Sequence, residues 1–178
     1  MVLALCSLTA LQAQDRFMTR NGHIRFYSHT PMEDIDANNN QVGSIIDMKT
    51  GEIVVSALNK SFEFSRALMQ EHFNENYMES DQYPKSAFKG TITNLQDVNI
   101  KKDGTYPVDV KGDLTIHGVT KAVLTKGTLE VKAGKINAVS KFNVAPEDYN
   151  ITIPSLVREK IAKTMEITVD LSYEPYTK

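Results

Sequence analysis

The sequence predicts an all-β protein in which about eight antiparallel strands curl into a barrel or a strongly curved sandwich. Three observations predict this class. Apolar and polar residues alternate with a period of two along most of the chain, which is typical of strands with one buried face. Short turns that contain glycine separate the alternating runs. Only two stretches have helical spacing. Closure into a barrel would also remove the open sheet edges that recruit other chains.

The first half of the chain contains four predicted strands. They span residues 23–28, 41–47, 52–59 and 87–95. Lys49-Thr50-Gly51 is expected to form a hairpin turn between the second and third strands, because glycine accepts the positive φ of such turns. The polar run at residues 36–41 (DANNNQ) is interpreted as a loop.

The second half contains four longer predicted strands. They span residues 105–116, 119–131, 135–144 and 165–173. The alternation is clearest in the first and last of these runs, where aliphatic side chains occupy every second position. Ala133-Gly134 is a tight turn between the middle pair, and Lys102-Asp103-Gly104 is expected to form a hairpin before the first run.

Residues 65–77 are predicted to form the one short helix. Leu68, Met69, His72, Phe73 and Tyr77 recur there at the three-to-five residue spacing that lines one helix face. A shorter helical turn is expected at residues 155–161, directly after Pro154.

The composition excludes several functional classes. The chain has 178 residues, of which 41% are hydrophobic and 24% charged, so it can bury a core of its own. Its formal net charge of −2 lacks the basic excess that non-specific nucleic-acid binding requires, so nucleic acid is not an expected partner. A single cysteine, Cys6, excludes a disulfide framework and a cysteine-based zinc site.

Residues 1–14 (MVLALCSLTALQAQ) are interpreted as a signal peptide. The segment has no charge, and its apolar run of about ten residues is too short for a bilayer, which needs about 20. The missing positive n-region indicates that the true start lies upstream or that Met1 is internal. A lipoprotein signal at Cys6 is the alternative, but Leu5 is too large for the preceding position. Residues 15–178 are then expected to be a single exported, soluble domain in a periplasm-like compartment, with no transmembrane segment.

Three blocks of sequence carry a resemblance to a known family. They are residues 112–121 (GDLTIHGVTK), 69–90 (MQEHFNENYMESDQYPKSAFKG) and 142–151 (FNVAPEDYNI). Together with the export signal, they resemble the YceI family of periplasmic polyisoprenoid-binding proteins. The resemblance spans roughly Asp15 to Tyr173. It implies an eight-stranded lipocalin-like barrel that holds a polyprenol or an isoprenoid quinone in its lumen. The chain departs from the family at Ala122, Pro146 and Asn150, where proline, arginine and glycine are usual.

An isoprenoid tail would be bound mainly by burial of apolar area, which contributes about 25 cal/mol per Å². Aromatic and flexible side chains concentrate around the predicted helix and its flanking strands, and we expect this group to form the mouth or wall of a pocket. Its members are Phe26, Phe62, Phe64, Leu68, Met69, Phe73, Tyr77, Tyr83 and Phe88. Arg25, Arg66 and His72 lie near them in the sequence and are the candidates for binding a head group. The alternative is that each aromatic residue belongs to an ordinary core.

Catalysis has no support in the sequence. The four histidines show no metal-ligand spacing, and no nucleophile elbow or phosphate-binding loop is present. Glu71, Glu75, Glu79 and Asp81 are interpreted as a solvated edge of the helix. No metal and no catalytic cofactor are therefore expected. The block at residues 112–121 is interpreted as a feature of the fold, with His117-Gly118 as a tight turn and Gly112 at a close backbone approach.

Three functional hypotheses follow from the sequence. The favoured hypothesis is a carrier or store for a long-chain isoprenoid lipid. The second is a structural or interaction barrel with a packed interior and no lumen ligand. The third is a hydrolase or isomerase that acts on a hydrophobic substrate. A homodimer is compatible with all three hypotheses, because homodimers are common among small proteins.

Overall fold

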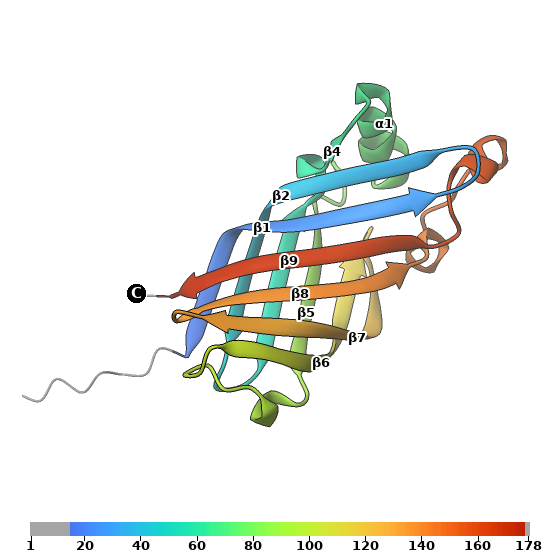
Figure 1. The fold of residues 1–178 in the computed structure, drawn as a ribbon. Coiled ribbons are helices and arrows are strands. Elements are labelled where there is room, and N and C mark those ends of the chain that lie inside the picture. Colours follow the sequence, from blue (N-terminus) through green and yellow to red (C-terminus); the bar gives the residue numbers. More distant parts are fainter. Residues whose placement is uncertain (1–14, 177–178) are drawn as a thin grey trace, which may run out of the picture.

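The computed structural model describes residues 15–176, whose strands form a closed antiparallel barrel (Figure 1). The strands are β1 Arg16–His29, β2 Asp34–Asp47, β3 Glu52–Leu58, β4 Glu63–Phe64, β5 Lys85–Ile92, β6 Gly104–Ile116, β7 Val119–Lys132, β8 Lys135–Val144 and β9 Met165–Pro175. Eight of them follow one another around the barrel in the order β1-β9-β8-β7-β6-β5-β3-β2, and the β1–β2 ladder closes it. The short β4 pairs with β2 as an additional strand. The predicted eight-stranded antiparallel barrel is therefore confirmed.

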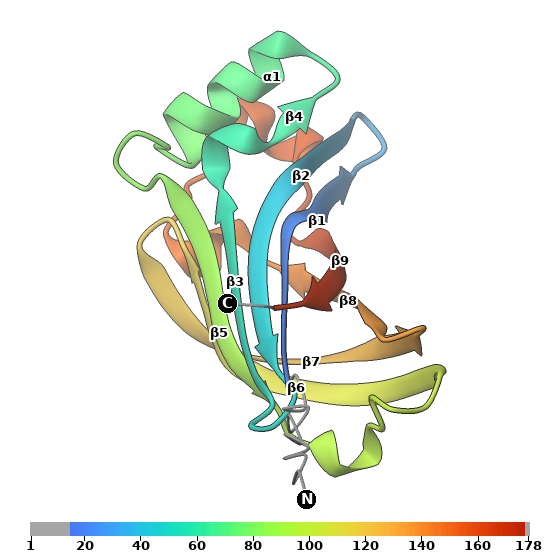
Figure 2. The ribbon, with the colours of Figure 1, turned by 90° about the vertical axis from the view of Figure 1, so that its left-hand side faces the viewer.

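The helical segments gather mainly at one end of the barrel, where Figure 2 shows α1 lying across the strands. Helix α1 spans Ala67–His72 and continues as a π-helical turn, η2, over Phe73–Tyr77. Four 3₁₀ turns complete the set: η1 Asn59–Ser61, η3 Leu95–Asp97, η4 Pro146–Tyr149 and η5 Ser155–Lys160. The helix predicted at 65–77 is thus confirmed, with a change of helix type at Phe73. The helical turn predicted at 155–161 is confirmed as η5.

Strands β1 and β2 are longer than predicted. Partway along each strand, the buried positions switch from odd-numbered to even-numbered residues, which interrupts the alternation used to predict it. In β1, the buried residues Phe17 and Thr19 have odd numbers, whereas Phe26 and Ser28 have even numbers. The β1–β2 register shifts between Thr19 and Ile24, where the strands bulge. A bulge interrupts the period-two pattern, so the sequence reveals only the part of β1 that follows it.

The loop interpretation of residues 36–41 was wrong, because these residues lie inside β2. Asn39 is fully buried, and its side chain replaces the missing apolar contact with hydrogen bonds. Its Nδ2 donates to the backbone oxygen of Leu58 at 2.9 Å, and its Oδ1 accepts from the backbone nitrogen of Gln41 at 2.9 Å. A polar side chain satisfied in this way can occupy a buried strand position.

The tight turns lie at their predicted positions, except for one. Gly51 has φ = 79°, and the pairs His117-Gly118 and Ala133-Gly134 both have positive φ, as two-residue hairpin turns require. The connection between β5 and β6 is longer than the hairpin expected at residues 102–104. It spans residues 93–103 and contains η3.

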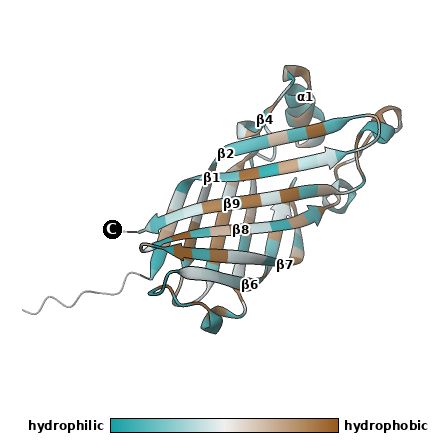
Figure 3. Ribbon diagram, in the orientation of Figure 1, coloured by the Kyte–Doolittle hydropathy of each residue, from teal (hydrophilic) through white to brown (hydrophobic). Residues whose placement is uncertain are grey.

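The end of the barrel opposite α1 is densely packed. Ile46, Leu129, Ile136 and Tyr173 are all less than 2% exposed there. The Tyr173 hydroxyl lies 2.6 Å from Ser44 Oγ, and burial raises the pKa of Tyr173 to about 12. Figure 3 shows hydrophilic and hydrophobic residues interleaved along the strands, as the alternation predicts.

The predicted signal peptide at residues 1–14 lies outside the described residues. Between residues 15 and 176, no helix has the length and apolar character needed to span a membrane.

Candidate ligand-binding cavity

The barrel encloses a cavity of about 520 Å³ that extends from the packed end toward α1. Leu129, Leu171 and Tyr173 line it at the packed end. Side chains of the strands form its wall, and α1, the β1–β2 hairpin and η5 contribute residues at the other end. The lining is mostly aliphatic and aromatic, which is the composition expected of a site for an apolar molecule.

Eight of the nine aromatic and flexible residues predicted to line a pocket do line the cavity. They are Phe26, Phe62, Phe64, Leu68, Met69, Phe73, Tyr77 and Phe88. Tyr83 is not among the lining residues. Its ring packs edge-on against His117, with 4.5 Å between ring centroids, beside the β6–β7 turn.

Four phenylalanine rings from three parts of the chain form a cluster at the α1 end of the cavity. Phe26 comes from β1, Phe62 and Phe64 flank Glu63 in the β4 region, and Phe73 begins η2. The Phe73 ring lies 5.4 Å from Phe26, 5.7 Å from Phe62 and 5.0 Å from Phe64 between centroids. These distances are typical of favourable aromatic pairs. The cluster therefore packs the helical segment onto the barrel and also forms part of the cavity wall.

The apolar face of α1 borders the cavity without being buried by other protein groups. Leu68, Met69 and His72 all line the cavity, yet no residue of α1 is buried, and Leu68 is 61% exposed. Burial raises the pKa of Tyr77, one turn further along in η2. The half-exposed apolar face identifies this end as the mouth of the cavity.

Four acidic or basic side chains line the cavity on segments at the mouth: Glu33, Arg66, His72 and Lys160. Arg66 forms an ion pair with Glu33, which joins the start of α1 to the β1–β2 hairpin. Two of the three predicted head-group residues, Arg66 and His72, are therefore at the mouth.

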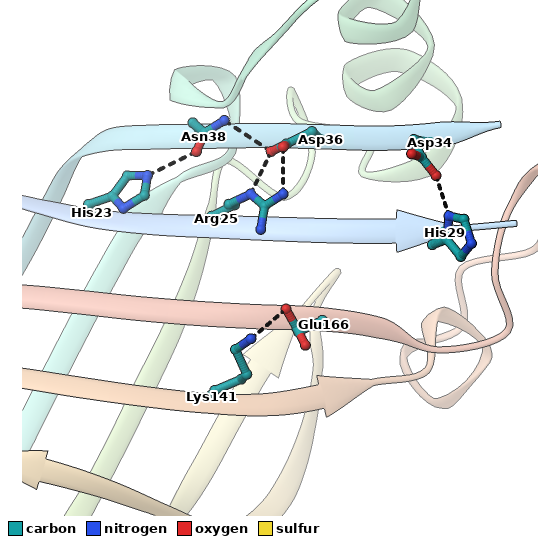
Figure 4. A network of polar contacts seen from close by, with 8 residues as sticks. All are labelled: His23, Arg25, His29, Asp34, Asp36, Asn38, Lys141 and Glu166. Carbon is teal, nitrogen blue, oxygen red and sulfur yellow. Dashed lines mark hydrogen bonds and ion pairs between the residues drawn. The ribbon is translucent and has the colours of Figure 1, made fainter.

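The third, Arg25, lies outside the cavity on the outer face of β1. Its Nε and Nη2 donate to the two carboxylate oxygens of Asp36 at 2.9 and 2.6 Å, as Figure 4 shows. This bidentate pair lowers the pKa of Asp36. Phe26 faces the interior, so the period-two alternation of a strand turns Arg25 outward. The alternation was readable in the sequence and could have excluded Arg25.

Other polar side chains on this outer face are also engaged with one another (Figure 4). His29 Nδ1 lies 2.5 Å from Asp34 Oδ1, and this hydrogen bond is the main cause of the lowered pKa of Asp34. Lys141 and Glu166 form an ion pair at 2.9 Å. The described part of the chain contains no group of three or more His, Cys, Asp or Glu side chains that could hold a metal ion.

One part of the cavity wall is not continuous sheet. Strands β7 and β8 pair only between Gly127–Lys132 and Lys135–Ser140. Nearer the mouth, β7 continues along β6 and β8 continues along β9, so the two strands diverge. The buried side chains of Ile151 and Ile153 line the cavity there. Neither residue was among the predicted pocket residues, although the alternation of Ile151 and Ile153 about Thr152 was a usable signal.

The glycine of the GDLTIHGVTK block shapes the wall as expected. A β-carbon on Gly112 would lie 2.4 Å from the Cα of its ladder partner Gly90 and 2.7 Å from the ring of Phe88. The absence of side chains at both glycines leaves room for the Phe88 ring, which lines the cavity. The expected close backbone approach at Gly112 is confirmed.

The histidine of the same block connects three segments at the mouth end. His117 Nε2 lies 2.7 Å from Glu79 Oε2, and Nδ1 lies 3.2 Å from the backbone oxygen of Tyr149. The β6–β7 turn is thereby joined both to the chain after η2 and to η4. This geometry supports the structural interpretation of the block.

A closed antiparallel barrel with an apolar interior and a mouth at one end defines the class of small β-barrels that enclose a cavity, as lipocalins do. Within this class, the chain belongs to the family of YceI-like domains, whose model matches residues 16–173.

Solved structures share the fold at low sequence identity. A polyisoprenoid-binding domain from Saccharophagus degradans has a TM-score of 0.80 and 15% identity, covering 92% of this chain and 99% of that one. BcnA from Burkholderia cenocepacia has a TM-score of 0.70 and 13% identity, with coverages of 85% and 95%. A YceI protein from Campylobacter jejuni has a TM-score of 0.59 and 14% identity, with coverages of 84% and 90%. Among curated proteins, none matches the chain significantly.

Proposed function

We propose that this protein binds a long-chain isoprenoid lipid, either a polyprenol or an isoprenoid quinone, in the lumen of its barrel, and stores or transports it. The observation that carries the proposal is the apolar cavity of about 520 Å³, packed at one end and bordered by ionisable groups at the other. A slender hydrocarbon gains about 25 cal/mol for each Å² of apolar surface that such a lumen buries.

The polarity of the cavity suits an amphipathic ligand. The tail would lie among the strand residues and the phenylalanine cluster. A head group would remain at the mouth, within reach of Arg66 and His72, which can donate hydrogen bonds to carbonyl or phosphate oxygens. Membership of the YceI-like family supports a lipid-binding role, and so does the fold shared with a domain that is described as polyisoprenoid-binding.

We propose a carrier rather than an enzyme, because the acidic and basic side chains that line the cavity lie on the mouth segments and most of the wall is apolar. We also propose that residues 1–14 direct export and are removed, leaving residues 15–178 as one soluble domain in a periplasm-like compartment. The mass of the protein recovered from the cell envelope tests this, since cleavage near Gln14 predicts a defined loss and retention of residues 1–14 contradicts it.

The test of ligand binding is organic extraction of the purified protein followed by mass spectrometry. We expect an isoprenoid in an amount comparable to the protein, or uptake of an added polyprenol or quinone. Ala138→Phe, which fills the lumen from β8, should reduce the bound amount. Ala122→Phe, on the exposed face of β7, is the matched control. A protein that carries no lipid and ignores added polyprenols and quinones would favour the barrel without a lumen ligand.

A further inference from the structure

Two exposed apolar side chains project from the segments around the cavity mouth. Leu156 in η5 is 92% exposed, and Met32 in the β1–β2 hairpin is 60% exposed. The backbone nitrogen of Ala162 donates to Ser28 Oγ at 2.9 Å, which holds the end of the η5 segment against β1. Both apolar side chains therefore belong to the same end of the barrel, where Figure 1 shows the η5 region near the β1–β2 hairpin.

Basic side chains accompany Leu156. Arg158, Lys160 and Lys163 follow it within seven residues, against one carboxylate, Glu159. Neither lysine forms an ion pair within residues 15–176, and both are exposed. Arg158 forms an ion pair with Glu147 at 2.7 Å. Within the described residues, Lys160 and Lys163 therefore carry the unpaired positive charge beside Leu156, with Glu159 as the nearby carboxylate in the sequence.

The acidic groups of the hairpin are already engaged. Glu33 is paired with Arg66, and Asp34 accepts a hydrogen bond from His29. They leave the lysines near Leu156 free to contact an anionic partner. An exposed apolar side chain flanked by basic residues is the pattern of segments that insert into the interface of a bilayer with anionic lipids.

The same surface is continuous with the cavity, because Val157 and Lys160 both line it. A long-chain lipid that enters the lumen from a bilayer avoids exposure to water only if the mouth is seated on the bilayer. We propose that the face formed by Met32, Leu156, Lys160 and Lys163 docks on the surface of a bilayer that contains anionic phospholipid. This inference rests on the proposed lipid-binding function, since it assigns the route by which the cargo enters.

Vesicle flotation tests the proposal. The wild-type protein is incubated with vesicles of phosphatidylcholine alone, and with vesicles of phosphatidylcholine and phosphatidylglycerol in equal parts. We expect strong binding only to the mixed vesicles, weakening as salt is added. Leu156→Ser should reduce the partition coefficient by about tenfold, as expected for removal of one inserted leucine. Lys163→Gln should reduce it by about fivefold.

Two matched controls separate docking from general surface effects. Leu124→Ser removes an 82% exposed leucine from the outer face of β7, and Lys132→Gln removes an exposed lysine near the packed end. Both should bind the mixed vesicles as the wild type does. Equal losses in the controls and the mouth variants would overturn the proposal.

The vesicles contain no isoprenoid, so docking and cargo binding are measured independently. A protein that yields an isoprenoid on extraction but does not float with either vesicle overturns docking alone. A protein that floats with the mixed vesicles but carries and accepts no isoprenoid overturns the proposed function alone.

Discussion

Gly112 on β6 lies directly opposite Gly90 on β5, and a β-carbon on Gly112 would stand 2.4 Å from the Cα of Gly90. The carbonyl oxygen of Lys89 would lie equally close. Both obstacles are backbone atoms, which cannot rotate away as a side chain can. The glycine pair therefore sets how closely β5 and β6 approach beneath the Phe88 ring.

Gly112→Ala should destabilise the protein by about 1–3 kcal/mol, the usual cost of forcing an extra methyl group into a packed site. Urea denaturation measures the change. Gly43→Ala is the control, because the nearest atom that its β-carbon would meet lies 3.9 Å away. We expect that control to change stability by less than about 0.5 kcal/mol. Equal effects at the two positions would contradict the assigned role of the glycine pair.

Arg66→Ala should weaken retention of the isoprenoid by about tenfold or more, because a charged hydrogen bond to a head group contributes about 1.5–3 kcal/mol. Competition with a fluorescent apolar probe measures the affinity. Arg25→Ala serves as the control, since its guanidinium is paired with Asp36 on the outer face. Unchanged lipid content in the Arg66 variant would remove this residue from the head-group site.

Phe73→Ala should loosen the segment that contains α1, because the Phe73 ring contacts Phe26, Phe62 and Phe64. The half-buried position predicts a loss of up to about 3 kcal/mol, below the cost of removing a fully buried ring. Amide hydrogen exchange should accelerate over residues 66–78. Leu68→Ala on the same segment, with its side chain 61% exposed, should leave stability within about 0.5 kcal/mol. Wild-type exchange rates in the Phe73 variant would refute the packing role.

Because Tyr173 is buried, we expect the folded protein to lose stability in alkaline solution. Burial raises its pKa in the folded state to about 12, whereas the unfolded chain releases this proton near pH 10. The contribution of Tyr173 to the free energy of unfolding is therefore fully present below about pH 10. It is lost as the pH rises to about 12, because Tyr173 ionises at a lower pH in the unfolded state than in the folded state. Two pKa units correspond to about 2.7 kcal/mol. Burial also raises the pKa values of Tyr77 and Tyr149, which add to the effect in the same direction.

Two variants isolate the contribution of Tyr173. Tyr173→Phe should lower stability by about 1 kcal/mol at neutral pH, through loss of the hydrogen bond with Ser44, and should flatten the alkaline decline. Ser44→Ala removes the same hydrogen bond but keeps the buried hydroxyl, so its decline should persist. Denaturation curves between pH 8 and pH 12 compare them. If the stability of Tyr173→Phe fell with pH as steeply as that of the wild type, another group would control the alkaline decline.

Local patterns in the sequence predicted much of the barrel. Strands β6 and β9 alternate without interruption, and period-two alternation depends only on neighbouring residues. The first half of β1 and the buried position of Asn39 were not predicted, and the reason is the same for both. A bulge and a satisfied buried amide both require a partner strand, and a local pattern does not contain that partner.

The candidate site shows the same division. Clustering in the sequence located the aromatic wall, because Phe62 and Phe64 directly precede the predicted helix and Phe73 lies within it. Tyr83 and Arg25 were predicted to belong to the same site only because they lie near these aromatic residues in the sequence. The structure directs Tyr83 toward His117 and Arg25 toward Asp36, since orientation depends on strand parity and on contacts with distant segments.

The sequence by itself determined the strand class of the chain, its tight turns and the position of its aromatic residues, because each of these follows from short-range periodicity and backbone preference. Only the tertiary structure decided that the interior is hollow near α1 and packed around Tyr173. The close approach of β5 to β6 beneath the Phe88 ring and the divergence of β7 from β8 near the mouth shape the cavity wall, and both depend on contacts between different strands, which a local pattern does not contain.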